Sequence, residues 1–281
     1  MTRVHPADHS PRLADRAWPS ATCAILLVPV GSTEQHGPHL PLATDTTIAD
    51  AVAGALSARA TGSPLDLVAA PPVPYGASGE HDGFAGTVSI GTEVLAAVLL
   101  EVGRSATRSA GRIIFVNGHG GNVDALRRAV PQLRDEGCDA AWLPCAQGPA
   151  AGPPAPGASM SDPLSRDVPA ADLHAGWAET SLLLHLTPDL VRPERPTGDE
   201  RPLSEILPDL RAHGVRGVSA NGVLGRPAEA TPERGAVLLA AIVDEAWARV
   251  TRGEVRHDGM LVPARDVGST AVRQPAIEGE A

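Results

Sequence analysis

Short apolar runs alternate along this chain with longer segments whose apolar residues recur at helical spacing, and this alternation constrains the fold more than any other feature. The run at residues 23–30 lies between turn residues and is typical of a buried strand. Strands that alternate with helices imply a mostly parallel sheet with right-handed crossovers, so we predict an α/β fold. The other predicted strands are 65–70, 112–117 and 139–144, and the predicted helices are 45–59, 92–110 (capped by Thr92), 123–136, 174–186 and 232–250.

Three segments lack this alternation. Residues 1–20 are polar and contain proline, so we expect a flexible lead-in. Residues 146–170 are rich in Ala, Pro and Gly and are too long for a plain connection, which indicates a flexible loop or lid. The last dozen or so residues have the composition of a disordered tail.

Composition excludes several classes of function. The formal net charge of -10 argues against binding to nucleic acid or to an anionic membrane surface. The chain contains no lysine, which excludes Schiff-base chemistry and a P-loop lysine. No apolar run is long enough to span a bilayer, and the first residues do not resemble a signal peptide. We therefore expect a soluble, cytoplasmic protein.

The three cysteines, Cys23, Cys138 and Cys145, do not predict a functional site. Their odd number does not fit a disulfide framework, and no pair has the C-x-x-C spacing of a thiolate zinc site. We interpret them as ordinary core or surface residues.

Metal-binding side chains gather where the predicted strands end. In open α/β sheets, ligands bind at the carboxyl ends of the strands. A mixture of carboxylates and imidazoles without thiolates suits zinc, manganese or iron. The candidates are Glu34, His36, His39 and Asp45 after the first strand, Glu80 and His81 after the second, His119 after the third, and His174 and Glu179 after the Pro-rich segment.

Two metal ions need a bridging ligand, and a carboxylate has two oxygens with which to bridge. We predict that Asp45 bridges and that Glu34, His36 and His119 are terminal ligands. Two ions roughly 3.5–4 Å apart can activate one water at neutral pH. His39 fits better as a residue that supports a ligand or faces substrate. Isolated loop histidines are usually solvated, which is our interpretation of His5, His9, His185, His213 and His257.

The glycine-rich loop Asn117-Gly-His-Gly-Gly-Asn122 has two interpretations. Glycines between a strand and a helix can hold a phosphate at the helix N-terminus, but the spacing is not G-x-G-x-x-G. A tight turn that leaves room for substrate beside His119 fits better. Ser78 does not lie in a G-x-S-x-G elbow, so a substrate contact is a better prediction for it than a nucleophile.

Three motifs together resemble the creatininase family. They are residues 30–42 with Asp45, residues 117–122, and His174-Ala-Gly-Trp-Ala-Glu-Thr180, and they occur in the family's order and spacing. The resemblance covers residues 21–255 and leaves 256–281 as a C-terminal tail. It implies a three-layer α/β/α fold, a site with two divalent metal ions, a homo-oligomer, and a role for His174 as the acid/base that protonates the leaving nitrogen.

The chain departs from creatininase beside His119. The metal-binding glutamate that creatininase carries two positions after this histidine is Gly121 here, so one ligand must come from elsewhere, and Glu179 is the candidate. The bulky aromatic residue next to the histidine is Gly120 here, which makes creatinine a poor substrate.

Further residues resemble the branch of this family whose members are peptidases of mycofactocin biosynthesis: 75–81, 84–91, 174–180 and 219–225. This resemblance implies a short peptide substrate, cut before a modified C-terminal Val-Tyr unit. The predicted substrate contacts are Ser78, Glu80, His81, Gly120 and Trp177, the last of which is also compatible with a place in the core. The alternatives are a hydrolase of a small cyclic or formyl amide and a non-catalytic metal- or nucleotide-binding protein.

Overall fold

The computed structural model describes residues 11–145 and 172–263. Its centre is a four-stranded parallel sheet of β1 (Cys23–Val30), β2 (Leu67–Ala69), β3 (Ala110–Asn117) and β4 (Ala140–Pro144). The spatial order is β2-β1-β3-β4, and Val30 at the end of β1 lies opposite Asn117 at the end of β3. All three pairings are parallel, as the alternation of strands and helices predicts.

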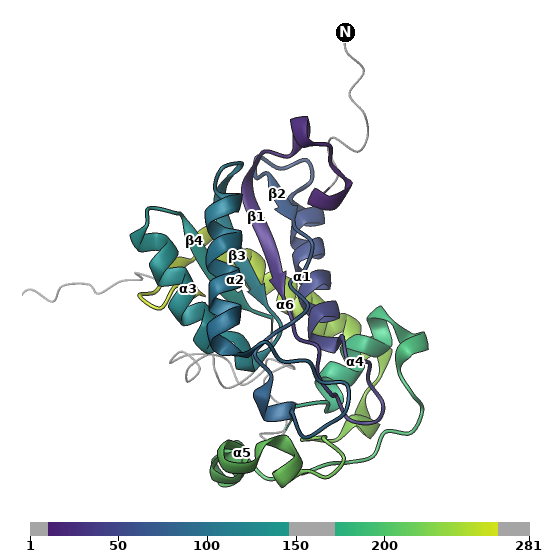
Figure 1. The fold of residues 1–281 in the computed structure, drawn as a ribbon. Helices are drawn as coiled ribbons and strands as arrows, with labels where there is room; N and C mark the ends of the chain where they lie inside the picture. Colours follow the sequence, from purple (N-terminus) through teal and green to yellow (C-terminus); the bar gives the residue numbers. More distant parts are fainter. Residues whose placement is uncertain (1–10, 146–171, 264–281) are drawn as a thin grey trace, which may run out of the picture.

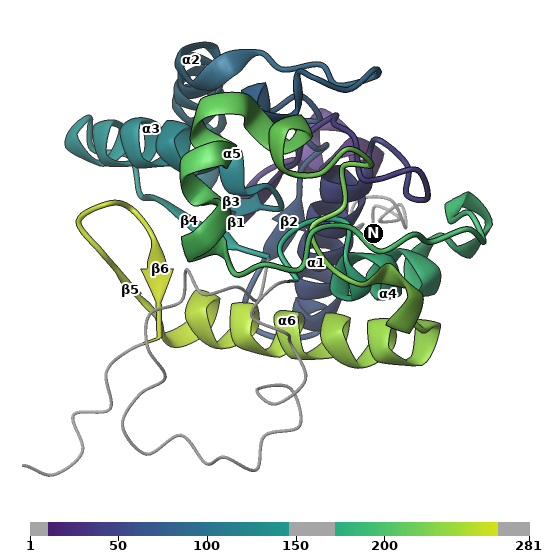
Figure 2. The same ribbon diagram turned by 90° about the horizontal axis from the view of Figure 1, so that it is seen from below.

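Helices cover both faces of the sheet and complete the predicted α/β/α layers (Figure 1). On one face, α1 (Thr44–Ala60), α4 (Trp177–Leu186) and α6 (Pro232–Arg252) share a hydrophobic core with Leu27 and Ile114 of the strands. On the other face, α2 (Gly91–Ala106) and α3 (Val123–Asp135) pack against strand residues that point the opposite way. Figure 2 shows α2 and α3 on one side of the sheet and α6 on the other.

The strand order places a topological switch point between β1 and β3. From β1 the chain crosses to β2 on one side, and the next strand, β3, pairs with β1 on the other side. The loops that leave β1 and β3 therefore diverge at the carboxyl edge of the sheet, which is where open α/β sheets bind their ligands.

Several elements differ from the sequence-based prediction. Helix α2 begins at Gly91 and ends at Ala106, and no side chain caps it, so the predicted cap at Thr92 is wrong. Helix α5 (Leu203–Val218) was not predicted. Its periodicity is interrupted because Pro208 lies inside it and Gly214 has a non-helical φ of 67°.

The ordered chain is also longer than the sequence indicated at both ends. Residues 13–15 and 18–20 of the predicted lead-in form the short 3-10 helices η2 (Leu13–Asp15) and η3 (Trp18–Ser20). They are tied down because the Pro11 carbonyl accepts a hydrogen bond from the Ala69 amide. The predicted tail begins with β6 (Leu261–Val262), which pairs with β5 (Glu254–Val255). This hairpin packs on β4, where Trp142 Nε1 donates to the Asp258 carbonyl.

The predicted flexible loop at 146–170, the first ten residues of the lead-in and the tail from residue 264 lie outside the described residues.

Within the described part of the chain, no helix is long and apolar enough to cross a membrane. All three cysteines are free, in keeping with their interpretation as ordinary residues.

Candidate active site

The candidate ligands converge at the switch point because two glycines let α1 approach the strand ends closely. A Cβ atom at Gly31 would lie 2.4 Å from the Cα of Thr46, and one at Gly118 would lie 2.4 Å from the carbonyl oxygen of Asp45. The first turn of α1 therefore fits against the ends of β1 and β3. Asp45 is carried there and is almost completely buried.

Asp45 lies between two histidines that come from different strands. Its Oδ1 atom is 3.1 Å from Nε2 of His36, which follows β1. Its Oδ2 atom is 3.2 Å from Nδ1 of His119, which follows β3. Two further carboxylates approach these histidines: Glu34 Oε2 is 3.2 Å from His119 Nε2, and Glu179 Oε2 is 3.9 Å from His36 Nε2.

These five residues form what we call the metal-ligand cluster: Glu34, His36, Asp45, His119 and Glu179. Two groups of three share Asp45, and in each group the possible ligand atoms lie within 4.8 Å of one another: Glu34, Asp45 and His119, and His36, Asp45 and Glu179. All five residues are among those predicted from the sequence.

The cluster fits a divalent cation. The buried oxygens Glu34 Oε1 and Asp45 Oδ2 each lie 3.2 Å from a histidine nitrogen, but neither accepts a hydrogen bond of acceptable geometry from a described residue. A buried carboxylate oxygen without a donor is costly unless a cation compensates it. Since the other donors are imidazole nitrogens and carboxylate oxygens, the set suits zinc, manganese or iron, as predicted.

The pKa values of the cluster follow from the same compensation. Burial and the nearby Asp45 raise the pKa of Glu34 to about 7. Burial alone would lower the pKa of His36, but contact with Asp45 raises it to about 10. Burial likewise opposes the charged form of His119, whose pKa nevertheless rises because Glu34 and Asp45 are close. The buried carboxylates of the cluster therefore favour positive charge close to them.

His174 faces the cluster with one defined nitrogen. Its Nε2 atom lies 2.8 Å from the backbone carbonyl of Gln35, which can only accept a hydrogen bond, so Nε2 carries the proton. Burial and the neighbouring His36 and His81 lower the pKa of His174, which keeps the ring neutral. The unprotonated Nδ1 lies 3.9 Å from Glu34 Oε1. His174 also forms a possible metal-ligand group with Glu34 and His36.

Gln35 is a site residue that the sequence-based prediction missed. Its Oε1 atom accepts a hydrogen bond from the Gly37 amide, and its Nε2 atom donates to the Gly222 carbonyl, which fixes the orientation of the side-chain amide. Nε2 also lies 2.9 Å from Nδ1 of His81 and 3.0 Å from Nε2 of His174. The signal for this role was present, because Gln35 stands between the predicted ligands Glu34 and His36.

Glu179 is positioned by the first turn of α4. Asp172 caps this helix, since its Oδ1 and Oδ2 atoms accept hydrogen bonds from the amides of Trp177 and Ala178. Glu179 Oε2 in turn accepts from the Ala175 amide at 2.7 Å. Ala175 has a φ of 52°, which is unfavourable for a residue with a Cβ and indicates a locally strained turn between His174 and α4.

The predicted substrate contacts divide into buried and accessible residues. Ser78 is completely buried; its hydroxyl contacts Ser32 Oγ and lies 3.4 Å from His119 Nε2. His81 is buried too, with Nε2 3.2 Å from Glu34 Oε1. Both residues are therefore buried beside the cluster. Glu80 and Gly120 are accessible and line a cavity.

The prediction for Trp177 as a substrate contact is wrong. Its side chain is 4% exposed and belongs to the core shared by α1, α4 and α6. The guanidinium group of Arg234 lies over the Trp177 ring, 5.3 Å from its centroid. His39 also stays outside the cluster; its Nε2 atom lies 2.9 Å from Thr180 Oγ1 on α4.

Comparisons with known proteins point to one family and one fold. A family model for creatininase, described as creatinine amidohydrolase, matches residues 11–250. The mycofactocin precursor peptide peptidase of Mycolicibacterium smegmatis is 50% identical over 240 residues, which cover 84% of this chain and 88% of that protein.

Solved creatininase structures share the fold. One titled as a manganese form is 25% identical, with a TM-score of 0.64, and the match covers 85% of this chain and 96% of that chain. A zinc–zinc form of a creatininase mutant is 24% identical, with a TM-score of 0.63 and the same coverage. The three-layer fold predicted from the sequence is thereby confirmed.

Proposed function

Because this chain belongs to the creatininase family of hydrolases, we propose that it is a metal-dependent peptidase that releases the Val-Tyr-derived unit from the end of a modified mycofactocin precursor peptide. The similarity to the M. smegmatis peptidase over most of both chains carries the choice of substrate. The cluster around Asp45 supports the choice of chemistry, because its donor set suits divalent cations.

We assign two metal sites that share Asp45. Glu34 and His119 complete one site, and His36 and Glu179 complete the other. Bound there, two divalent ions would supply an activated water and polarise the carbonyl of the scissile amide. Glu179 takes the place of the ligand that is lost at Gly121, since its Oε2 atom lies on the His36 side of the cluster.

His174 acts as the acid/base. Its Nδ1 atom faces Glu34 and is free to take a proton, because Nε2 is engaged by the carbonyl of Gln35. The proton then passes to the amine nitrogen as the amide bond breaks, which makes that nitrogen a competent leaving group. Gln35 supports this role, because its backbone carbonyl accepts a hydrogen bond from His174 Nε2 and its side-chain amide can donate to His81 Nδ1.

A peptide fits the surroundings of the cluster better than a small ring does. A Cβ atom at Gly120 would meet nothing within 4 Å, so this position is open. At Gly121 a Cβ would lie 2.3 Å from the Ala77 carbonyl oxygen and 2.7 Å from Glu80 Oε1, which excludes a side chain. Gly120 thus leaves open space beside His119 in which an extended chain can lie, whereas Gly121 allows the loop to pack closely on Ala77.

Cleavage of a synthetic precursor peptide tests the proposal. The metal-loaded protein is incubated with modified and unmodified peptide, and the products are identified by mass spectrometry alongside creatinine and a panel of small cyclic and formyl amides. We expect one cut before the Val-Tyr unit, abolished by a chelator. Hydrolysis of a small amide with both peptides intact would instead support the alternative hydrolase, and binding without any turnover would support the non-catalytic alternative.

A further inference from the structure

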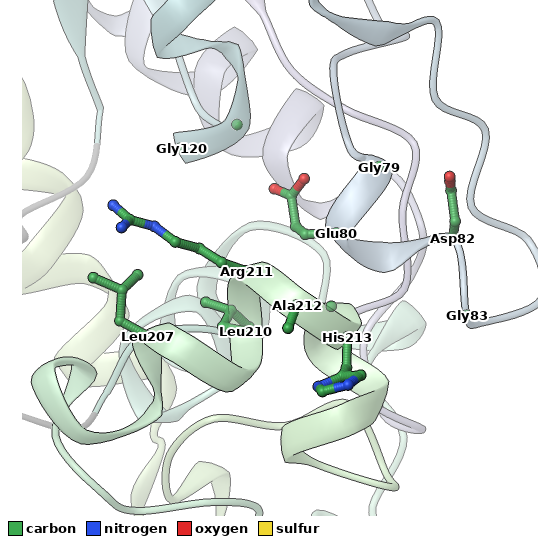
Figure 3. Close-up of a pocket in the computed structure, with 12 residues that line it drawn as sticks. Gly79, Glu80, Asp82, Gly83, Gly120, Leu207, Leu210, Arg211, Ala212 and His213 are labelled. Atoms are coloured by element: carbon green, nitrogen blue, oxygen red, sulfur yellow. The ribbon is translucent and has the colours of Figure 1, made fainter.

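A cavity of about 820 Å³ adjoins the metal-ligand cluster (Figure 3). Its walls come from η4 (Gly79–His81) and the turn that follows it, from η5 (Gly120–Asn122), and from α5. Glu80 connects the cavity to the cluster, because its side chain lines the cavity while its Oε1 atom lies 3.4 Å from His119 Nε2. Binding pockets for small ligands measure roughly 300–1,000 Å³, so this cavity is large enough to hold part of a peptide.

One wall of the cavity is formed by α5, which contributes Leu207 and residues 210–214. Leu207, Leu210 and Arg211 line it and are three and four residues apart, the spacing that brings side chains together on a helix. Figure 3 shows the Arg211 side chain reaching from α5 towards Gly120, while His213 turns to the other side of the helix. The wall thus offers apolar surface with one guanidinium group.

Close backbone packing holds this wall in place. Gly214 has a φ of 67°, and a Cβ atom there would lie 2.6 Å from the Glu80 carbonyl oxygen, so only glycine lets α5 approach η4 this closely. Two residues on, Arg216 Nη1 donates a hydrogen bond to the Gly83 carbonyl at 2.8 Å. Arg211 is therefore presented to the cavity from a fixed support.

The charge of Arg211 is not balanced within residues 11–145 and 172–263. It forms no hydrogen bond or ion pair with them, and of the two acidic lining residues, Glu80 and Asp82, Glu80 faces His119 and His81. The chain as a whole carries a formal net charge of -10, so a lone guanidinium beside an acidic cluster is a local exception. A guanidinium group is suited to bind a carboxylate through two parallel hydrogen bonds.

We propose that this cavity binds the substrate peptide beside its scissile bond and that Arg211 binds a carboxylate of that peptide. The carboxylate belongs either to the terminus or to an acidic side chain, and both present the same two oxygens. The inference rests on the proposed function, since it takes the substrate to be a peptide. Leu207 and Leu210 would contact apolar parts of the same chain.

Equilibrium binding tests this inference without turnover. The C-terminal segment of the precursor peptide is synthesised with a reduced scissile bond, and its Kd for the metal-loaded protein is measured by fluorescence anisotropy. Companion peptides have one carboxylate neutralised at a time, by a C-terminal amide or by Asn or Gln in place of each acidic residue. The protein variants are Arg211→Gln, Arg211→Lys, and the control Arg252→Gln on α6, outside the cavity lining.

We expect Arg211→Gln to weaken binding of the parent peptide about 10- to 100-fold, the usual worth of a hydrogen-bonded charge pair. Neutralising one particular carboxylate of the peptide should weaken its binding to the unmutated protein by the same factor. The same neutralised peptide should bind Arg211→Gln no more weakly than the parent peptide does. The peptide that behaves in this way identifies the carboxylate that Arg211 binds. Arg211→Lys should be intermediate, and Arg252→Gln should bind normally.

Equal binding of the parent peptide by Arg211→Gln and the unmutated protein would overturn the inference, as would the absence of any effect of neutralisation. If the unmutated protein still cleaves the precursor before the Val-Tyr unit in that case, only the role of Arg211 fails. If the unmutated protein does not cleave the precursor, the proposed function itself is refuted, whatever the binding data show.

Discussion

Asp45 holds His36 and His119 on its two carboxylate oxygens, at 3.1 Å from Oδ1 and 3.2 Å from Oδ2. The two histidines follow different strands, so this carboxylate joins the loops on both sides of the switch point. A carboxylate with one oxygen directed to each histidine is suited to bridge two cations, and this relationship underlies the assignment of two metal sites.

Replacing Asp45 by Ala should empty both sites, because both of the assigned sites contain Asp45. We expect metal analysis of the purified variant to fall to background while circular dichroism stays unchanged. Glu179→Gln should lose only one of the two ions, since Glu179 belongs to one group. The control is Asp244→Ala on α6, whose side chain is 72% exposed. Two fully occupied sites in Asp45→Ala would refute the bridge.

Replacing His174 by Ala should slow peptide cleavage by about 10²–10⁴-fold, the usual contribution of a general acid/base. Metal content should stay at the level of the unmutated protein, because the five-residue cluster is intact. His185→Ala, an exposed histidine on α4, controls for the loss of an imidazole. Metal analysis decides the role: if His174→Ala also loses metal, His174 is a ligand and its assignment as acid/base is wrong.

Replacing Gln35 by Glu should move the pH dependence of kcat/KM. The new carboxylate keeps an oxygen for the Gly37 amide but cannot donate to His81 or to the Gly222 carbonyl. A negative charge close to His174 favours the protonated ring and raises the pKa of that histidine. The acid limb of the profile should therefore move to higher pH. An unchanged limb combined with reduced thermal stability would mean that Gln35 acts only on folding.

The elements that could be predicted from the sequence are those whose signal is local. Residues 23–30 are a strand with the predicted bounds, and Glu34, His36 and Asp45 meet because a single strand end carries all three. His119 and Glu179 join them, as expected for loops that share the carboxyl edge of one sheet.

The features of the site that could not be predicted from the sequence depend on tertiary packing. Trp177 and Glu179 lie in the same turn of α4. The Trp177 ring is nevertheless buried in the core, whereas the Glu179 carboxylate faces the cluster. The direction of each side chain is set by how α4 packs on α1 and α6, which no motif encodes. Arg211 was missed because Pro208 and Gly214 interrupt the periodicity of its helix, so nothing separated it from the other arginines of the chain.

Replacing Gly120 by Tyr should reduce peptide binding without affecting metal content. A Cβ atom at this position meets nothing within 4 Å, so the variant should fold normally and the ring should occupy the cavity beside His119. We expect KM for the precursor peptide to rise at least about tenfold, which corresponds to roughly 1.4 kcal/mol of lost binding. Ala58→Tyr, at an exposed position of α1, is the matched control. An unchanged KM would mean that the peptide does not bind beside Gly120.

The most direct test of the account is a metal titration. The protein is stripped by a chelator, Mn²⁺ is added back in measured equivalents, and cleavage of the precursor peptide is followed by mass spectrometry at each step. Two metal sites that share Asp45 predict no cleavage by the stripped protein and full activity at two equivalents per chain. Cleavage at full rate by protein shown to be free of metal would contradict the account.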